Sequence, residues 1–172
     1  LAEFKPEELR AWGAELDRDR LTVAFVEPDI LFANGSSDLK PDFKLILDDF
    51  FPRYLSVVTS SEFREEVEEL RIEGHTSRYW NQETGLSAYL KNMALSQART
   101  LSVLAYVMPK DEVITQTNWL IGHLTANGLS SSQPKIGGEG REDPQRSRRV
   151  EFRIRTKAEA KLNSIISPLA ND

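Results

Sequence analysis

Residues 149–155 (RVEFRIR) alternate strictly between charged and apolar side chains, and this pattern constrains the fold strongly. A period of two residues is that of a β-strand with one face toward the core and the other away from it. The apolar face carries Val150, Phe152 and Ile154, and the opposite face carries Arg149, Glu151, Arg153 and Arg155. A sheet that contains this strand needs a covering layer on its apolar side.

Two long segments predict helices that can form this layer. Apolar residues recur at helical spacing over residues 41–55 and again over residues 85–108, where Pro109 should stop the helix. Pro52 should kink or end the first of these helices. A shorter helix is expected around residues 119–124.

The remaining segments give weaker signals. Residues 1–20 and 62–69 are acidic and indicate helices, whereas residues 70–73 alternate and indicate a strand. Residues 21–32 are rich in Val, Ile and Phe, which favours a strand, and Pro28 should place its centre at an edge or a bulge. Strands separated by amphipathic helices predict a two-layer α/β sandwich.

The composition excludes several kinds of site. The chain has no cysteine and two histidines, which excludes disulfides, thiolate chemistry and a His-rich metal centre. Residues 1–75 carry a net charge of −9 and residues 76–172 a net charge of +4. This distribution argues against a nucleic-acid binder, whose domain is usually basic throughout. The longest uncharged stretch, residues 113–134, is too polar to span a bilayer.

The second long helix carries a polar stripe. With 3.6 residues per turn, Asn92 lies about 20° and Ser96 about 60° from Arg99 around the helix axis. We expect these three side chains to face away from the core and the opposite face to be buried. That buried face would hold Leu90, Ala94, Leu101 and Met108. The Arg99 guanidinium could bind a carboxylate through two hydrogen bonds, although an ordinary solvated face would show the same pattern.

The turn Gly74-His75-Thr76-Ser77 follows a predicted strand. Its backbone amides and hydroxyls could hold a small anion, although a structural histidine is the alternative. A Ser-His-Asp triad stays open because its members are dispersed in sequence, but the G-x-S-x-G nucleophile elbow is absent. Residues 137–140 lack the glycine spacing of a dinucleotide or phosphate loop. No cofactor site is therefore predicted.

Four short motifs, in order along the chain, resemble those of the OmpA-like peptidoglycan-binding family, which includes the C-terminal domains of OmpA and MotB. Residues 74–76 resemble its G-H-T-D turn, and residues 92–99 (NMALSQAR) resemble its N-x-x-L-S-x-x-R helix motif. Residues 138–144 loosely resemble its G-x-G-E-x-x-P loop, and residues 147–152 (SRRVEF) resemble its N-R-R-V-E-I strand. Together these motifs are more specific than any one of them.

The resemblance implies a β-α-β-α-(α)-β-β order with a mixed four-stranded sheet. It divides the chain into a linker helix (residues 1–20), the domain itself (residues 21–157) and a C-terminal tail (residues 158–172). Such a domain is noncatalytic, needs no cofactor or metal, and binds the stem peptide of peptidoglycan, with the helix arginine on a diaminopimelate carboxylate. Carried over to this chain, the implied binding residues are Arg99, Asn92, Leu95, Thr76, Ser77, Tyr89 and Arg149.

Ser77 stands where the family has an aspartate, so the negative charge that would meet the ammonium group of the ligand is missing. This serine, with Tyr89 three residues before Asn92, resembles a stator-type subgroup that includes the ZorB subunits of Zorya antiphage motors. That resemblance implies a periplasmic domain of a single-pass inner-membrane protein, anchored through residues upstream of Leu1. The implied partners are peptidoglycan, a second copy and a membrane-embedded subunit, with no nucleic acid.

Two other functions remain open at this stage. A domain of the same fold could serve dimerisation or docking without binding the wall, and the loss of the acidic side chain at Ser77 motivates this alternative. A hydrolase on a similar α/β scaffold is the other alternative.

Overall fold

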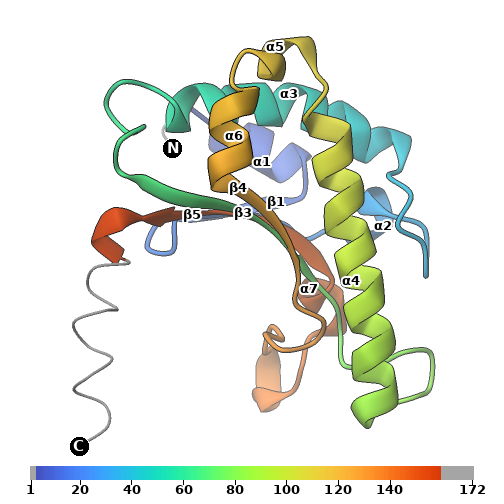
Figure 1. The fold of residues 1–172 in the computed structure, drawn as a ribbon. Helices are drawn as coiled ribbons and strands as arrows, with labels where there is room; N and C mark the ends of the chain where they lie inside the picture. Colours follow the sequence, from blue (N-terminus) through green and yellow to red (C-terminus); the bar gives the residue numbers. More distant parts are fainter. Residues whose placement is uncertain (1–2, 160–172) are drawn as a thin grey trace, which may run out of the picture.

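The computed structural model describes residues 3–159. Among these residues, five strands form one twisted sheet in the order β1-β2-β5-β3-β4, and the long helices cover one of its faces (Figure 1). The strands are β1 (Ala14–Asp17), β2 (Thr22–Phe25), β3 (Val67–His75), β4 (Leu124–Gly128) and β5 (Arg149–Thr156). Only β3 and β4 are parallel neighbours; the other pairs are antiparallel. The predicted two-layer α/β sandwich is confirmed, with five strands in place of the predicted four.

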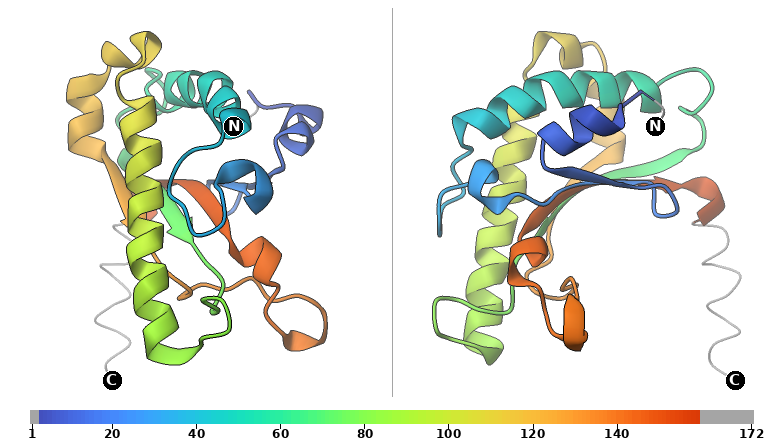
Figure 2. Two further views of the ribbon diagram at one scale, coloured as in Figure 1. Left: turned by 90° about the vertical axis from the view of Figure 1, so that its right-hand side faces the viewer. Right: turned by 180° about the vertical axis from the view of Figure 1, so that it is seen from behind.

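The two long helices lie where the sequence predicts them, over the same face of the sheet (Figure 2). The helices are α1 (Pro6–Ala11), α2 (Pro28–Leu31), α3 (Pro41–Val58), α4 (Gly85–Val107), α5 (Asp111–Ile114), α6 (Thr117–His123) and α7 (Pro144–Ser147), with a 3-10 turn η1 (Gly138–Gly140). Helix α4 ends before Pro109, as predicted. Helix α3 does not end at Pro52, because buried side chains on both sides of the proline, among them Phe50 and Tyr54, hold the helix on the sheet.

The core confirms the alternation in β5. Val150, Phe152 and Ile154 are all buried, and the Phe152 ring lies 5.0 Å from the Phe50 ring of α3 and 5.9 Å from the Phe25 ring of β2. Edge-to-face contacts of this kind add to the stabilisation that burial of the rings already gives. The aromatic cluster therefore joins α3 to the centre of the sheet.

The charged face of β5 is only partly exposed. Arg149 and Glu151 are 3% and 1% exposed, although the alternation places them away from the aromatic core. The segment between β4 and β5 folds over this end of the sheet, and Arg149 Nη1 donates to the main-chain oxygen of Gln133 at 3.2 Å. Two charged side chains are thus enclosed between the sheet and a loop.

The N-terminal region differs from the single helix predicted over residues 1–20. A tight turn at Gly13, with φ +60°, separates α1 from β1, and β1 pairs with β2 at the sheet edge. Phe4 and Leu9 are buried in the core, so α1 packs against the rest of the fold. The extra strand arises because the loose apolar spacing of this segment suits a short helix and an edge strand equally well.

Two further segments are corrected by the structure. In the predicted strand 21–32, only Thr22–Phe25 is a strand, and Pro28 begins α2, because proline is favoured in the first turn of a helix. The predicted helix 62–69 is a series of turns that leads into β3 at Val67, because this acidic segment has no apolar stripe to bury. The predicted tail from residue 158 lies almost entirely outside the described residues. No helix within residues 3–159 has the length and apolar character needed to cross a membrane.

Candidate ligand-binding site

Helix α4 packs on the sheet through small polar side chains, and its leucines face outward. Asn92, Ser96 and Thr100 are 3%, 1% and 0% exposed, whereas Leu90 and Leu101 are 57% and 61% exposed. The prediction of the buried face is therefore wrong. The four positions expected in the core are exposed or half-buried: Leu90, Ala94, Leu101 and Met108.

Two glycines on the sheet explain this reversal. A Cβ atom at Gly128 would lie 2.3 Å from the Gln97 main-chain nitrogen, and one at Gly74 would lie 2.9 Å from the Ser96 main-chain oxygen. The helix backbone therefore rests directly on β3 and β4, and only small side chains can occupy the contact. Ser96 Oγ also accepts a hydrogen bond from the Ser130 amide at 3.1 Å, which is a contact that a leucine could not make.

The Arg99 side chain extends from α4 toward the loop between α2 and α3. Its Nε donates to the Ser36 main-chain oxygen at 2.8 Å, and its Nη2 donates to the Ala33 main-chain oxygen at 3.3 Å. The guanidinium carbon lies 4.7 Å from the centre of the Phe32 ring, which is a cation–π contact. The loop thus fixes the direction of the guanidinium without neutralising its charge.

Arg99 is a partly buried cation with no acidic partner. Among residues 3–159, no carboxylate oxygen lies within 4.0 Å of its nitrogens. Burial, and to a smaller extent the positive charge of nearby Arg148, lower the pKa of Arg99 to about 10. A buried charge is normally paired, so this site favours an anion that the chain itself does not supply.

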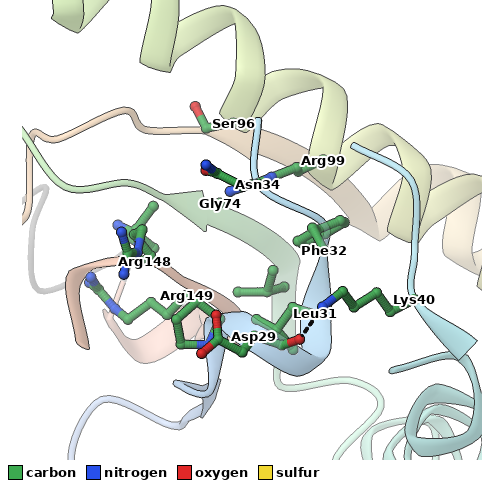
Figure 3. Close-up of a pocket in the computed structure, with 13 residues that line it drawn as sticks. Asp29, Leu31, Phe32, Asn34, Lys40, Gly74, Ser96, Arg99, Arg148 and Arg149 are labelled. Carbon is green, nitrogen blue, oxygen red and sulfur yellow. Dashed lines mark hydrogen bonds between the residues drawn. The ribbon is translucent and has the colours of Figure 1, made fainter. Parts of the chain in front are cut away.

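Two adjoining cavities open at this arginine. One, of about 380 Å³, is lined by five of the predicted binding residues: Thr76, Ser77, Asn92, Leu95 and Arg99. The other, of about 430 Å³, is also lined by Arg99, and Figure 3 shows Arg148 and Arg149 entering it from the start of β5. Asn34, Arg99 and Arg148 line both cavities, which places two cations at their junction.

The turn after β3 is held in place by hydrogen bonds from its neighbours. Asn92 Nδ2 donates to the main-chain oxygens of Ser77 and Tyr79, each at 3.1 Å. The Thr76 amide donates to the Ser130 main-chain oxygen at 2.9 Å, whereas Thr76 Oγ1 is buried without a hydrogen-bond partner. Asn92 therefore positions the turn with its amide nitrogen, and the Thr76 hydroxyl remains available.

The other two predicted residues lie in different surroundings. Tyr89 does not line either cavity, and its main-chain oxygen accepts a hydrogen bond from Ser130 Oγ at 2.8 Å. Arg149 lines the second cavity, but its Nε is bound to Glu151 Oε1 at 2.5 Å. Arg148 was not among the predicted binding residues, although it stands in the same double-arginine motif that pointed to Arg149.

Comparisons with known proteins agree with this arrangement. No family model matches the chain. The cell wall anchor of the T6SS from Pseudomonas aeruginosa superposes with a TM-score of 0.59 at 24% identity, covering 91% of this chain and 97% of that one. A putative MotB-like protein from Desulfovibrio vulgaris gives a TM-score of 0.57 at 25% identity, covering 88% of each chain. The periplasmic domain of Helicobacter pylori MotB gives a TM-score of 0.53 at 16% identity, covering 88% of this chain and 87% of that one.

The fold and the motifs around Arg99 therefore define an OmpA/MotB-like domain, a noncatalytic class of peptidoglycan-binding domain. The Zorya protein ZorB of Escherichia coli (strain ATCC 8739) is 49% identical to this chain over 160 residues, which cover 92% of the chain and 67% of the relative. The chain belongs to the ZorB family.

Proposed function

We propose that this domain binds the stem peptide of peptidoglycan in the periplasm and so anchors a membrane protein to the cell wall. The observation that carries the proposal is the unpaired guanidinium of Arg99 at the junction of two cavities. A carboxylate of the ligand, such as that at the end of a diaminopimelate side chain, would provide the missing negative charge. Hydrogen bonds between ionised groups are about twice as strong as neutral ones.

The rest of the cavity supplies polar and apolar contacts for such a ligand. The unpaired Thr76 hydroxyl can donate or accept one hydrogen bond, and Leu95 gives an apolar wall. Ser77 offers a hydroxyl where a carboxylate would pair with the ammonium group of diaminopimelate. The carboxylate end of the ligand therefore supplies most of the charge recognition in this proposal.

The named relatives support an anchoring role. One structural neighbour is a cell wall anchor and another is a periplasmic domain of MotB. The ZorB relative is longer than the aligned segment. We extend the proposal accordingly to a periplasmic location and to attachment, through the rest of the protein, to a membrane-embedded partner subunit.

Sedimentation with purified diaminopimelate-type peptidoglycan tests the proposal. The wild-type chain should pellet with the wall, and Arg99→Ala should weaken binding by roughly 10- to 100-fold, since one charge-assisted contact is lost. Lys91→Ala is the matched control, because it removes one positive charge from the exposed side of the same helix. Wild type that stays in the supernatant at all salt concentrations would contradict wall binding.

A second pair of measurements tests the choice of ligand. Lysine-type peptidoglycan lacks the side-chain carboxylate of diaminopimelate, so it should bind more weakly than the diaminopimelate type. Ser77→Asp should tighten binding to diaminopimelate, because it restores an acidic partner for the ammonium group. Equal binding to both walls would show that Arg99 does not recognise this carboxylate.

The exposed leucines of α4 favour a second function, dimerisation. Leu86, Leu90 and Leu101 are 73%, 57% and 61% exposed, and they follow one side of the helix. We propose a second copy of the chain as the partner of this surface. The two functions are compatible, because the leucines lie on the side of α4 opposite Asn92.

A further inference from the structure

Three titratable side chains meet on the sheet face that points away from the aromatic core. Glu73 of β3 and Glu151 of β5 are directly paired in the sheet register, and His75 follows two residues later on the same face. Their side chains are 2%, 1% and 0% exposed. Like charges directly opposite on neighbouring strands are destabilising, so two buried carboxylates at this position need compensating positive charge.

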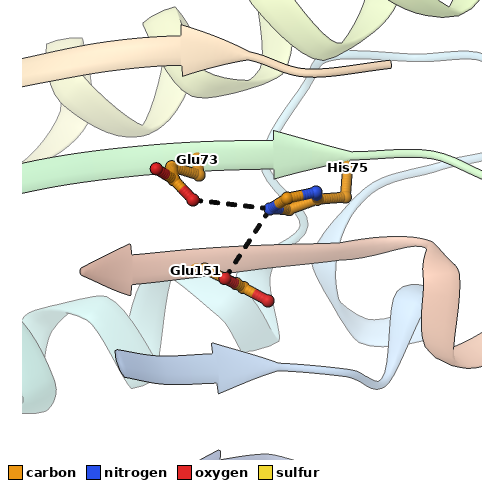
Figure 4. Close-up of side chains that lie close together, drawn as sticks. All are labelled: Glu73, His75 and Glu151. Atoms are coloured by element: carbon orange, nitrogen blue, oxygen red, sulfur yellow. Dashed lines mark ion pairs between the residues drawn. The ribbon is translucent and has the colours of Figure 1, made fainter. Parts of the chain in front are cut away.

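The atoms that face one another in this cluster have no partners. Glu73 Oε2, Glu151 Oε2 and His75 Nε2 are all buried without a hydrogen bond. Figure 4 shows the two carboxylates converging on the ring nitrogen, at 3.8 Å from Glu73 Oε2 and 3.7 Å from Glu151 Oε2. Both distances are too long for hydrogen bonds, which rarely exceed about 3.2 Å.

The same distances suit a metal ion at the centre. One ligand atom from each of the three residues lies within 4.8 Å of the other two. Ligands at about 2.0–2.1 Å from a tetrahedral zinc ion are roughly 3.4 Å apart, so small side-chain movements would bring all three into coordination. Each of the three facing atoms would then gain a partner, whereas His75 Nδ1, which is also buried without a hydrogen bond, would not.

The outer oxygens of both carboxylates are already oriented by cations. Glu151 Oε1 accepts from Arg149 Nε at 2.5 Å and lies 4.0 Å from Lys135 Nζ. Glu73 Oε1 lies 3.6 Å from Arg71 Nη1. Partners of this kind fix the direction of coordinating carboxylates in known metal sites. They also leave the inner oxygen of each glutamate pointing toward the histidine.

We propose that Glu73, His75 and Glu151 bind one divalent transition-metal ion of the zinc type. A set of one imidazole nitrogen and two carboxylate oxygens suits zinc, whereas magnesium and calcium prefer sites made of oxygen alone. The ion would join β3 to β5 next to the Gly74–Ser77 turn. It would therefore stabilise the wall of the candidate ligand-binding site without touching the ligand.

Titration of the chelator-treated chain with Zn²⁺, and with Co²⁺ as a spectroscopic probe, tests this proposal. The wild-type chain should bind one equivalent of zinc, melt at a higher temperature with zinc than with Mg²⁺, and give visible Co²⁺ bands typical of mixed nitrogen and oxygen ligands. His75→Gln should lower the zinc affinity by at least about 100-fold, because it removes a direct ligand. His123→Gln is the matched control, because this histidine stacks on Trp119, is not a member of the three-residue cluster and should leave zinc binding unchanged.

Glu73→Gln and Glu151→Gln keep the test valid if His75→Gln does not fold. Each variant keeps the shape of the side chain and replaces one carboxylate ligand with a weakly coordinating amide. Each should also abolish the response to zinc. The proposal is overturned if wild type takes up no zinc, or if the three ligand variants bind it as tightly as wild type does.

Discussion

Gly128 of β4 lies directly against Gln97 of α4, and a Cβ atom at this glycine would meet the Gln97 nitrogen at 2.3 Å and the Ser96 hydroxyl at 2.7 Å. Gly128→Ala should therefore push the helix off the sheet and lower the free energy of unfolding by about 1–3 kcal/mol. Urea denaturation followed by circular dichroism measures this change.

Gly122 provides the control for that substitution. It lies inside α6, and a Cβ atom there meets nothing within 4 Å. Gly122→Ala should stabilise the chain by about 0.5–1 kcal/mol, because alanine has the higher helix propensity. Equal stability of the two variants would show that α4 does not depend on contact with the Gly128 backbone.

Asn92 should act on ligand binding through the turn after β3. Its two hydrogen bonds hold the main-chain oxygens of Ser77 and Tyr79. In Asn92→Asp, a carboxylate oxygen replaces the Nδ2 nitrogen that donates both hydrogen bonds, and this oxygen repels the two main-chain oxygens. The variant should therefore lose about 1–3 kcal/mol of stability and bind peptidoglycan more weakly. Hydrogen exchange should show faster exchange in residues 76–80 of the folded variant.

Asn92→Ala separates the two effects. It loses the hydrogen bonds without adding repulsion, so its loss of stability should be the smaller of the two. If either variant shows wild-type hydrogen exchange in residues 76–80 and binds the wall normally, Asn92 does not position the turn.

The sequence predicts best those features that a single element determines. The alternation of residues 149–155 is enough to place Phe152 in the core, because its neighbours on the strand define both faces. That prediction needed no knowledge of how other elements pack. The resemblance to the OmpA-like family, rather than the periodicity of either element, predicts that Thr76 and Arg99 belong to one binding site, and both line one cavity.

The orientation of α4 could not be predicted in this way. Leu90 and Leu101 suggest a buried stripe, but Gly74 and Gly128 on two separate strands decide which face of the helix can approach the sheet. The meeting of Glu73 with Glu151 depends in the same way on the register of β3 and β5. Such features follow from pairs of elements, and helical periodicity contains no information about them.

Glu69 should make stability depend on acid pH. Burial works to raise the pKa of Glu69, but hydrogen bonds from Arg71, Thr125 and Arg155 outweigh it, so the pKa lies below its usual 4.5. A carboxyl with a lowered pKa in the folded state stabilises the fold above the pKa of the unfolded chain. This contribution is lost as the pH falls through the folded-state pKa.

The expected result is a fall in the free energy of unfolding below about pH 4.5 that is shallower in Glu69→Gln than in wild type. Urea denaturation between pH 3 and pH 7 measures it. Glu68→Gln is the control, because this neighbouring side chain is exposed. Parallel curves for wild type and Glu69→Gln would contradict a role for Glu69 in acid stability.

The outward leucines of α4 should mediate association of two chains. Replacing Leu90 and Leu101 together with glutamate should abolish a concentration-dependent dimer, because it places charges on the proposed apolar contact. Monomer stability should stay within about 0.5 kcal/mol of wild type, since both side chains are exposed. Leu45→Glu is the control, because Leu45 is 69% exposed but lies on α3. Sedimentation velocity over a range of concentrations measures the dimer, and wild type that remains monomeric throughout would refute this surface as a dimer contact.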